Sequence, residues 1–374
     1  LAVGYALLPY TTIDRARKLA GKSGETMLSA WVRIGTDNSV TVIVPHSEMG
    51  QGVHTSLPMM LAEELDADWS LVRMEQAPAD MAFANFGLAR GYLRGDKSIP
   101  SWMSGPADFG FRKIAESMNL QVTGGSTSVR FTGVDGMRRT GAAARSMLIA
   151  AAAAKWGVPA AEIEAKQSTL THASGKSATY GEMAEAAAAI APPADVPLKA
   201  KKDYTIVGTP IARFDIPSKV DGSAKYGLDV RLANMSYAVV TASPVFGGTL
   251  KSVDEAPAKA IRGVKQVVKL PDAVAVVADN TWRAKEAALA LKPQWNEGAH
   301  ASVSSKSIYA AMDAALDAGK FEADHSVGDV DTALKAATKV IEGAYRVPYL
   351  AHATMETMNC TAQFENGKLT VWGG

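Results

Sequence analysis

The stretch Ser39–Thr55, SVTVIVPHSEMGQGVHT, joins a β-branched apolar run to a loop that holds two glycines. The run Ser39–Val44 predicts a buried strand, because β-branched side chains favour extended backbone and the proline that follows cannot donate to a sheet. After the loop, MMLAEEL has helical spacing, so we expect a helix through Asp66 that is capped by Thr55 or Ser56. The unit is therefore strand, glycine loop, helix.

The loop contains a candidate anion site. Gly50 and Gly52 would let backbone N–H groups approach a ligand closely, and the following helix points its positive dipole end at the same place. Gln51, His54 and Thr55 add polar groups that donate or accept hydrogen bonds. Taken alone, however, the motif favours an ordinary strand-to-helix turn in which glycine serves only backbone geometry.

A second loop of the same kind, QVTGGSTSVR, begins at Gln121 and precedes a helix expected over about 134–156. Its small and hydroxyl residues are Gly124, Gly125, Ser126, Thr127 and Ser128. Two such loops at helix starts suit an extended, phosphate-bearing ligand. Neither loop is a Rossmann fingerprint or a P-loop, so an ordinary nicotinamide dehydrogenase is disfavoured.

The remaining patterns predict an α+β chain. We expect a long irregular stretch over 77–118, a hairpin over 162–180 that turns at Ser174-Gly175, a short helix over 181–190, and a linker, APPADVPLKAKK, over 191–202. Beyond the linker, strand-like segments over 235–243 and 264–270 alternate with helical ones over 256–261 and 282–291. A final segment of helix and strand covers 302–374 and includes the strand-like KLTVW.

Composition excludes several classes of protein. The 374 residues carry 39 Lys plus Arg and 38 Asp plus Glu with no basic block, so no nucleic-acid partner is expected. The one cysteine, Cys360, rules out an internal disulfide and a four-thiolate cluster. Residues 1–10, LAVGYALLPY, are too short to span a bilayer. They fit either the remnant of a signal or anchor segment, or a short core element at the start of the fold.

Two groups of acidic or histidine residues are candidate metal sites. His352 and Glu356, in HATME, would share one face of a helix, but no third ligand is near in sequence. A histidine packed beside Met355 and Met358 is the commoner situation. The acids Glu322, Asp324, Asp329 and Asp331 lack calcium-loop spacing and favour a solvated face. No metal ligand is therefore predicted in this chain.

Taken together, the motifs resemble the molybdopterin-binding subunit of the xanthine oxidase family of molybdenum hydroxylases. The branch that the chain is most similar to contains isoquinoline 1-oxidoreductase beta subunits and membrane-bound aldehyde dehydrogenases. The resemblance covers nearly the whole chain. It rests on SVTVIVPHSEMGQGVHTSLPMMLAEEL, QVTGGSTSVR, FDIPSKVDGSAKYGLDV with VAVVADNTWRAKEAA, and YLAHATMETMNCTA, in that order. Thr357 departs from the family, which has proline after Met-Glu.

The resemblance implies a fold and a cofactor site. It implies a molybdopterin-binding domain of mixed sheets and helices over 27–203, an α/β-hammerhead domain over 204–298, and the start of a second molybdopterin-binding segment over 299–374. Residues 1–26 are then a signal or anchor remnant and lead-in. The cofactor, molybdenum-molybdopterin in its cytosine dinucleotide form, would contact Gly50, Gln51, Gly52, His54, Gly124, Gly125, Ser126, Thr127 and Ser128.

The resemblance also implies an activity that needs partners. Members oxidise aldehydes or N-heteroaromatic compounds with water as the oxygen source and pass electrons to a small subunit with two-iron two-sulfur clusters, then in some cases to a cytochrome c subunit. The family's catalytic glutamate and a further glycine loop are expected beyond residue 374, so no catalytic residue is predicted here. A second polypeptide or a continuation would complete the site, in a periplasmic location. The alternative is a non-catalytic cofactor-binding or structural fragment of the same family.

Overall fold

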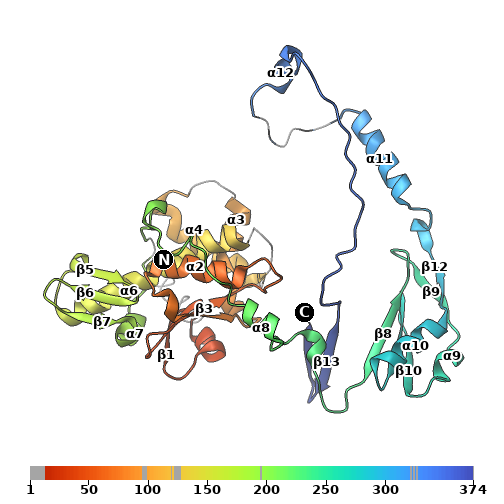
Figure 1. Cartoon of the computed structure of the whole chain (residues 1–374), viewed down its shortest axis with the longest axis horizontal. Coiled ribbons are helices and arrows are strands. Elements are labelled where there is room, and N and C mark those ends of the chain that lie inside the picture. The colour runs from red at the N-terminus through yellow and green to blue at the C-terminus, as the bar shows by residue number, and fades with distance from the viewer. Residues whose placement is uncertain are drawn as a thin grey trace. The chain divides into compact units, whose positions relative to one another are not determined.

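The computed structural model describes residues 13–94, 99–118, 120–121, 128–193, 196–320, 322, 325 and 327–373. The chain divides into two compact units, Leu1–Ala224 and Lys225–Gly374, and each is described by itself (Figure 1). Several small sheets and many helices confirm the α+β class. The predicted N-terminal signal or anchor remnant lies largely outside the described residues, which begin with a helix over 13–20.

A four-stranded sheet forms the centre of the first unit. Its order is β1 (Glu25–Ser29), β2 (Val32–Gly35), β3 (Val40–Val44) and β4 (Val72–Gln76), with β3 and β4 parallel and the other pairs antiparallel. Helix α2 (Val53–Leu65) makes the crossover between the parallel strands. All five residues of β3 are buried, which confirms the predicted strand. The glycine loop therefore follows the carboxyl end of a buried strand, a common place for ligands in such sheets.

The start of α2 differs from the prediction. The helix begins at Val53 with Gly52 as its N-cap, in a left-handed conformation with φ 84°, and no side chain caps it. Thr55 and Ser56 therefore lie in the first turn, because the left-handed glycine lets the chain enter the helix before either hydroxyl. Its end is as predicted, since Asp66 is a left-handed C-cap with φ 54°.

The prediction of a long irregular stretch over 77–118 was wrong. The segment folds into η2 (Met81–Phe83), α3 (Phe86–Arg94) and α4 (Ser101–Ser117). Its glycines suggested a loop, but one of them serves close packing instead. A Cβ added to Gly91 would lie 2.1 Å from the ring of Phe131. Only glycine therefore lets α3 lie this close to the segment that contains Phe131.

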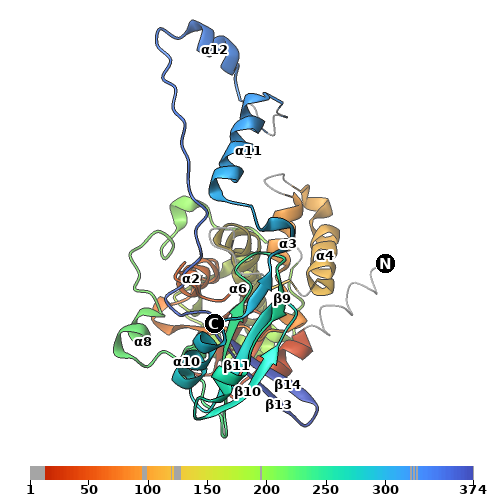
Figure 2. The same cartoon turned by 90° about the vertical axis from the view of Figure 1, so that its right-hand side faces the viewer.

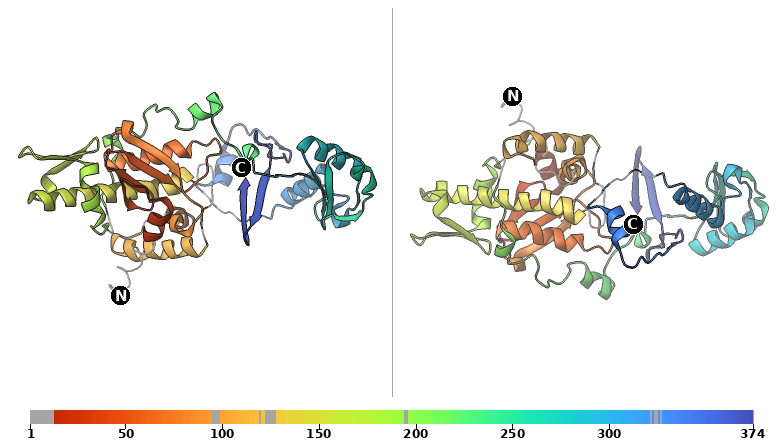
Figure 3. Two further views of the ribbon diagram at one scale, coloured as in Figure 1. Left: turned by 90° about the horizontal axis from the view of Figure 1, so that it is seen from below. Right: turned by 90° about the horizontal axis from the view of Figure 1, so that it is seen from above.

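The second loop leads into η3 (Ser128–Arg138), a π-helical segment, and then α6 (Arg139–Trp156). The left-handed Gly157, with φ 66°, ends the helix as predicted. Figure 3 shows α6 running past α2 toward the sheet of β5 (Ile163–Lys166), β6 (Thr169–His172) and β7 (Ser177–Thr179). The predicted turn at Ser174-Gly175 joins β6 to β7, and α7 (Tyr180–Ala188) follows with a Thr179–Glu182 capping box. An additional turn at Gln167-Ser168 makes three strands of the expected two.

The predicted linker is fixed to the first unit rather than free. We name residues 196–215 the strap. The Glu63 carboxylate accepts hydrogen bonds from the N–H groups of Thr205, Ile206 and Val207 at 2.6–3.1 Å and pairs with Lys199 at 3.0 Å. A buried carboxylate is stable only when its oxygens accept several hydrogen bonds. Glu63 therefore fixes the strap against the end of α2. After the strap comes α8 (Ile216–Asp221).

The second unit begins with an α+β body. Its sheet has the order β10 (Val264–Lys269), β11 (Ala273–Ala278) and β8 (Tyr237–Ala242), all antiparallel, beside a pair of β12 (Gln294–Asn296) and β9 (Thr249–Ser252). Helices α9 (Ala256–Lys259) and α10 (Thr281–Leu291) cover the core, as Figure 2 shows for α10. The predicted alternation of strands and helices is confirmed.

The last part of the second unit contains α11 (Ser305–Asp317), α12 (Val330–Ala336) and the hairpin of β13 (Cys360–Glu365) and β14 (Lys368–Gly373). Residues 337–359 contain neither helix nor strand, so His352 and Glu356 do not share a helix face. Thr357 lies in this same irregular segment. Within the described residues, no helix combines the length and apolarity that a bilayer crossing requires.

Candidate cofactor-binding site

The glycine loop binds an anion that belongs to the loop itself. The Glu48 carboxylate accepts hydrogen bonds through Oε1 from the N–H of Gly50 at 2.8 Å and of Gly52 at 2.9 Å. Its Oε2 accepts from the N–H of His54 at 3.1 Å. Only 5% of the Glu48 side chain is exposed. The predicted affinity of this helix start for negative charge is thus met by an internal carboxylate.

Gln51 also turns back onto its own loop. Its Nε2 donates to the Ser47 carbonyl at 2.8 Å, and its Oε1 accepts from the N–H of Met49. Within the part of the chain that the structure describes, the Gln51 N–H donates to no other group. A Cβ on Gly50 or Gly52 would meet no atom within 4 Å, so the space beside both glycines is open. The loop therefore has a closed inner side around Glu48 and an open outer side.

Arg213, on the strap, holds the loop from outside, and sequence reasoning did not single it out. Its Nη2 lies 3.2 Å from Glu48 Oε1, and its Nη1 donates to the Gly50 carbonyl at 3.1 Å. Asp215 orients the guanidinium through two hydrogen bonds of 2.9 and 2.7 Å. These bonds hold the pKa of Asp215 far below its ordinary value, and Lys219 lowers it further. The same pairing raises the pKa of Arg213.

The strap contacts the start of α2 at two more points. The N–H of Phe214 donates to Thr55 Oγ1 at 3.0 Å, and the Phe214 ring stacks on Trp69 with centroids 5.2 Å apart. Thr55, which was predicted as a helix cap, thus anchors the strap instead. The segment FDIPSK carried part of the resemblance, but no local signal in the sequence relates it to a loop 163 positions away.

His54 serves the backbone rather than a ligand. Its Nε2 lies 2.9 Å from the His46 carbonyl, and the side chain is buried. His46 in turn belongs to a buried polar cluster in which its Nε2 lies 2.7 Å from Thr132 Oγ1 and 3.0 Å from Asn85 Nδ2. The Leu88 N–H donates to Asn85 Oδ1, which fixes the orientation of the amide and makes the His46 Nε2 an acceptor.

The structure describes the second loop only from Ser128 onward, where the next segment begins. Gly124, Gly125, Ser126 and Thr127 lie outside the described residues, and Ser128 opens η3. Thr132, one turn further on, contacts His46 at the end of β3. The segment that follows the second loop therefore packs against the residues that precede the first.

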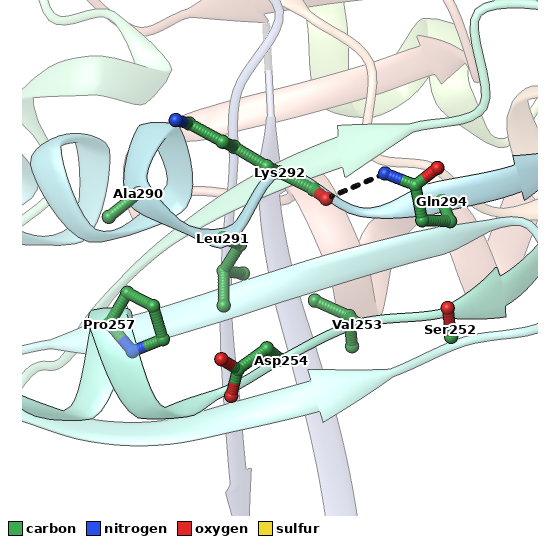
Figure 4. Close-up of a pocket in the computed structure, with 8 residues that line it drawn as sticks. All are labelled: Ser252, Val253, Asp254, Pro257, Ala290, Leu291, Lys292 and Gln294. Carbon is green, nitrogen blue, oxygen red and sulfur yellow. Dashed lines mark hydrogen bonds between the residues drawn. The ribbon is translucent and has the colours of Figure 1, made fainter.

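Two hollows contain no predicted site residue. The larger, of about 610 Å³, is in the second unit and is lined by Ser252, Val253, Asp254, Pro257, Ala290, Leu291, Lys292 and Gln294 (Figure 4). The Gln294 side chain donates to the Lys292 carbonyl at 3.5 Å. Among the described residues, no three His, Cys, Asp or Glu side chains gather in a way that could hold a metal ion.

Comparisons with known proteins relate this geometry to a cofactor. Residues 2–89, which include the glycine loop, and residues 315–374 match the family described as molybdopterin cofactor-binding domain. The chain is 33% identical over 302 residues to the beta subunit of isoquinoline 1-oxidoreductase from Brevundimonas diminuta, covering 71% of this chain and 35% of that protein.

Two further relatives match over most of this chain. Membrane-bound aldehyde dehydrogenase (pyrroloquinoline-quinone) of Gluconacetobacter polyoxogenes is 27% identical over 92% of this chain and 42% of its own length. The B subunit of nicotinate dehydrogenase from Pseudomonas putida is 27% identical over 94% of this chain and 27% of its own length. The chain thus spans less than half the length of each of these relatives. By its molybdopterin cofactor-binding domains, it belongs to the xanthine oxidase family.

Proposed function

We propose that the chain forms part of the molybdopterin-binding subunit of a molybdenum hydroxylase that oxidises aldehydes or N-heteroaromatic compounds with water as the oxygen source. The observation that carries the proposal is the glycine loop, which follows a buried strand, opens on one side and lies inside a cofactor-binding match. The relatives named above, which act on aldehydes, isoquinoline or nicotinate by their names, support the substrate classes.

The residues present fit a pterin with a phosphate tail. Gly50 and Gly52 have φ of 94° and 84° with open space beside them, so a flat ligand can approach the backbone. Among the described residues, the Gln51 N–H donates to no group and the buried Ser56 hydroxyl has no hydrogen-bond partner. The proposed binding residues are therefore Gly50, Gln51 and Gly52, together with Gly124 to Ser128 of the second loop, while His54 supports them from within.

The bound cofactor would supply the redox chemistry, and this chain would supply binding and orientation. Strand β3 and helix α2 fix the two ends of the loop, and the buried His46, Asn85 and Thr132 cluster ties it to the segment after the second loop. A site held by rigid elements in this way keeps a ligand in one orientation. The general base of the reaction is proposed to come from outside these residues.

The low number of cysteines supports the proposal of partner subunits. A chain with one cysteine cannot hold iron–sulfur clusters of its own, so electrons would leave through a small two-iron two-sulfur subunit and then a cytochrome c subunit. Two of the relatives are named as subunits of larger enzymes, which supports a heteromeric assembly. We further propose the cytosine dinucleotide form of the cofactor, a periplasmic location, and the α/β-hammerhead assignment for residues 204–298 between cofactor-binding segments at 27–203 and 299–374.

The test is metal analysis and turnover of the complex purified from its native source. We expect stoichiometric molybdenum together with iron, and reduction of an artificial dye when an aldehyde or N-heteroaromatic compound is added. Molybdenum and pterin without turnover on any of these substrates would favour the non-catalytic alternative. A complete complex that contains iron but no molybdenum would overturn the proposal.

A further inference from the structure

The donors of the glycine loop fall into two groups. The N–H groups of Gly50, Gly52 and His54 already bind the Glu48 carboxylate, whereas the Gln51 N–H, between them in sequence, is free among the described residues. Met49, on the same turn, is 64% exposed. A ligand therefore meets two different surfaces on the two sides of one loop.

We propose that Glu48 permanently occupies these three N–H groups and that Glu48 and Arg213 are a positioning pair for the Met49–Gln51 turn. The inference rests on the proposed function and deepens it. The cofactor then meets the outer side of the turn, and its phosphate is bound elsewhere than at the three N–H groups. The loop acts as a shaped support for the pterin rather than as a phosphate cradle.

Burial and charge explain why Glu48 stays in place. Its carboxylate is nearly inaccessible, accepts three N–H bonds at the positive end of α2 and faces the Arg213 guanidinium. A phosphate from solution would have to displace a carboxylate that the chain holds at a very high effective concentration. This displacement would also leave the buried charge of Glu48 without its N–H partners.

Arg213 is itself held in place, which makes the pair a rigid unit. Asp215 binds the guanidinium at two atoms, and the next residue, Phe214, is fixed by Thr55 and by the Trp69 ring. At the other end of α2, the strap is clamped by Glu63. The shape of the glycine loop therefore depends on a segment that enters the first unit much later in the chain.

The experiment uses the full chain with Glu48→Ala and, as a second variant, Arg213→Met. The matched controls are Glu162→Ala, which removes a carboxylate that is 57% exposed and paired with His172, and Arg283→Met, which removes a partly exposed arginine paired with Asp279. Thermal unfolding of each cofactor-free protein is followed in sodium chloride, sodium acetate and inorganic phosphate. Cofactor content is measured on the assembled complex of each variant.

We expect Glu48→Ala to lower Tm by about 5 °C, since charge-assisted bonds to three N–H groups are lost. Acetate, a carboxylate small enough to replace the missing group, should restore part of that loss in Glu48→Ala and should not change the wild type or Glu162→Ala. Cofactor content should fall roughly tenfold in Glu48→Ala and to a lesser extent in Arg213→Met. A residue that only stabilised the fold would not respond to acetate in this selective way.

Changes of cofactor content and anion binding in the opposite direction would overturn the inference. If the three N–H groups are a phosphate site and Glu48 is a plug, Glu48→Ala should bind inorganic phosphate more tightly and retain more cofactor than the wild type. A wild-type Tm that rises with phosphate but not with acetate would point the same way. Failure of the proposed function looks different, because wild-type complex would then lack the cofactor whatever the acetate response.

Discussion

The loop at Glu48–His54 and the segment at 337–359 both lie in or next to stretches of cofactor-binding sequence, yet they fold very differently. In the loop, a buried carboxylate, two glycines and a distant arginine satisfy one another. In the segment, apolar side chains stay in water, with Tyr345 94% and Met358 97% exposed. The first is closed by buried contacts from residues far away in sequence. The second meets distant described residues through exposed contacts, such as those of the Leu228 N–H with Glu356 Oε1 and of the Tyr309 hydroxyl with the Val347 carbonyl. The comparison indicates that buried long-range contacts, rather than the local motif, close a cofactor-binding segment.

The largest effect should come from breaking the sheet that carries the loop. Arg33 on β2 is fully buried, pairs with Glu25 and with Glu75, and donates to the Ala20 carbonyl. Arg33→Ala leaves the partly buried Glu25 without its partner and Glu75 with Lys22 alone, so we expect a loss of about 3–5 kcal/mol in the unfolding free energy. Urea unfolding measures it. Arg283→Ala, which removes a partly exposed arginine, should change the free energy much less, and equal losses in both variants would contradict this interpretation.

Glycine geometry in the loop should give the next largest effect. Gly52→Ala places a side chain on a residue with φ 84°, and because nothing lies within 4 Å of the new Cβ, the cost is backbone strain alone, about 1–2 kcal/mol. Gly110→Ala in α4 is the matched control, since that site is also open but has helical backbone. It should be neutral or stabilise by about 0.5–1 kcal/mol. The two variants should therefore shift the urea midpoint in opposite directions.

A smaller effect should appear in the pH dependence of stability. The pKa of Asp215 is lowered in the folded chain by Arg213 and then Lys219, so its contribution is present above the unfolded pKa and is lost as pH falls through the folded pKa. The free-energy difference between wild type and Asp215→Asn should be largest near neutral pH. It should shrink once the pH falls below about 4. Unfolding by urea at a series of pH values tests this, and a constant difference would exclude Asp215 as the source.

The exposed segment should respond least to mutation. Met358→Ser changes a side chain that already lies in water, so we expect less than about 0.5 kcal/mol change in unfolding free energy for the chain alone. The same change should lower aggregation, because exposed apolar side chains promote association. Light scattering during thermal unfolding measures this. A loss comparable with that of Arg33→Ala would show that the segment packs against the folded chain.

Sequence patterns predicted what local chemistry determines. The β-branched run at 40–44, the helix end at Gly157 and the turn at Ser174-Gly175 each follow from a few neighbouring residues. The alternation of strands and helices in the second unit was also predicted from the sequence. These features depend on backbone propensity, which is a local property.

Contacts between distant segments could not be predicted. The glycines of α3 suggested a loop because nothing in the sequence indicates that Phe131 will pack against Gly91. Glu48 was not singled out, since its role requires the left-handed glycines that turn three N–H groups toward it. Arg213 reaches the loop only through the fixed path of the strap. Gly50, Gln51 and Gly52 were predicted as site residues and remain a prediction, whereas the groups that hold them in place were not predicted.

The most direct test of the central claim is the amount of pterin released per chain from the complex purified from its native source. We expect about one pterin per chain in the wild type. We also expect a clear loss when Gly52→Ala strains the loop, with Gly110→Ala unchanged. Wild-type complex that contains no pterin, or pterin that is retained equally in Gly52→Ala and Gly110→Ala, would contradict the claim that this loop binds the cofactor.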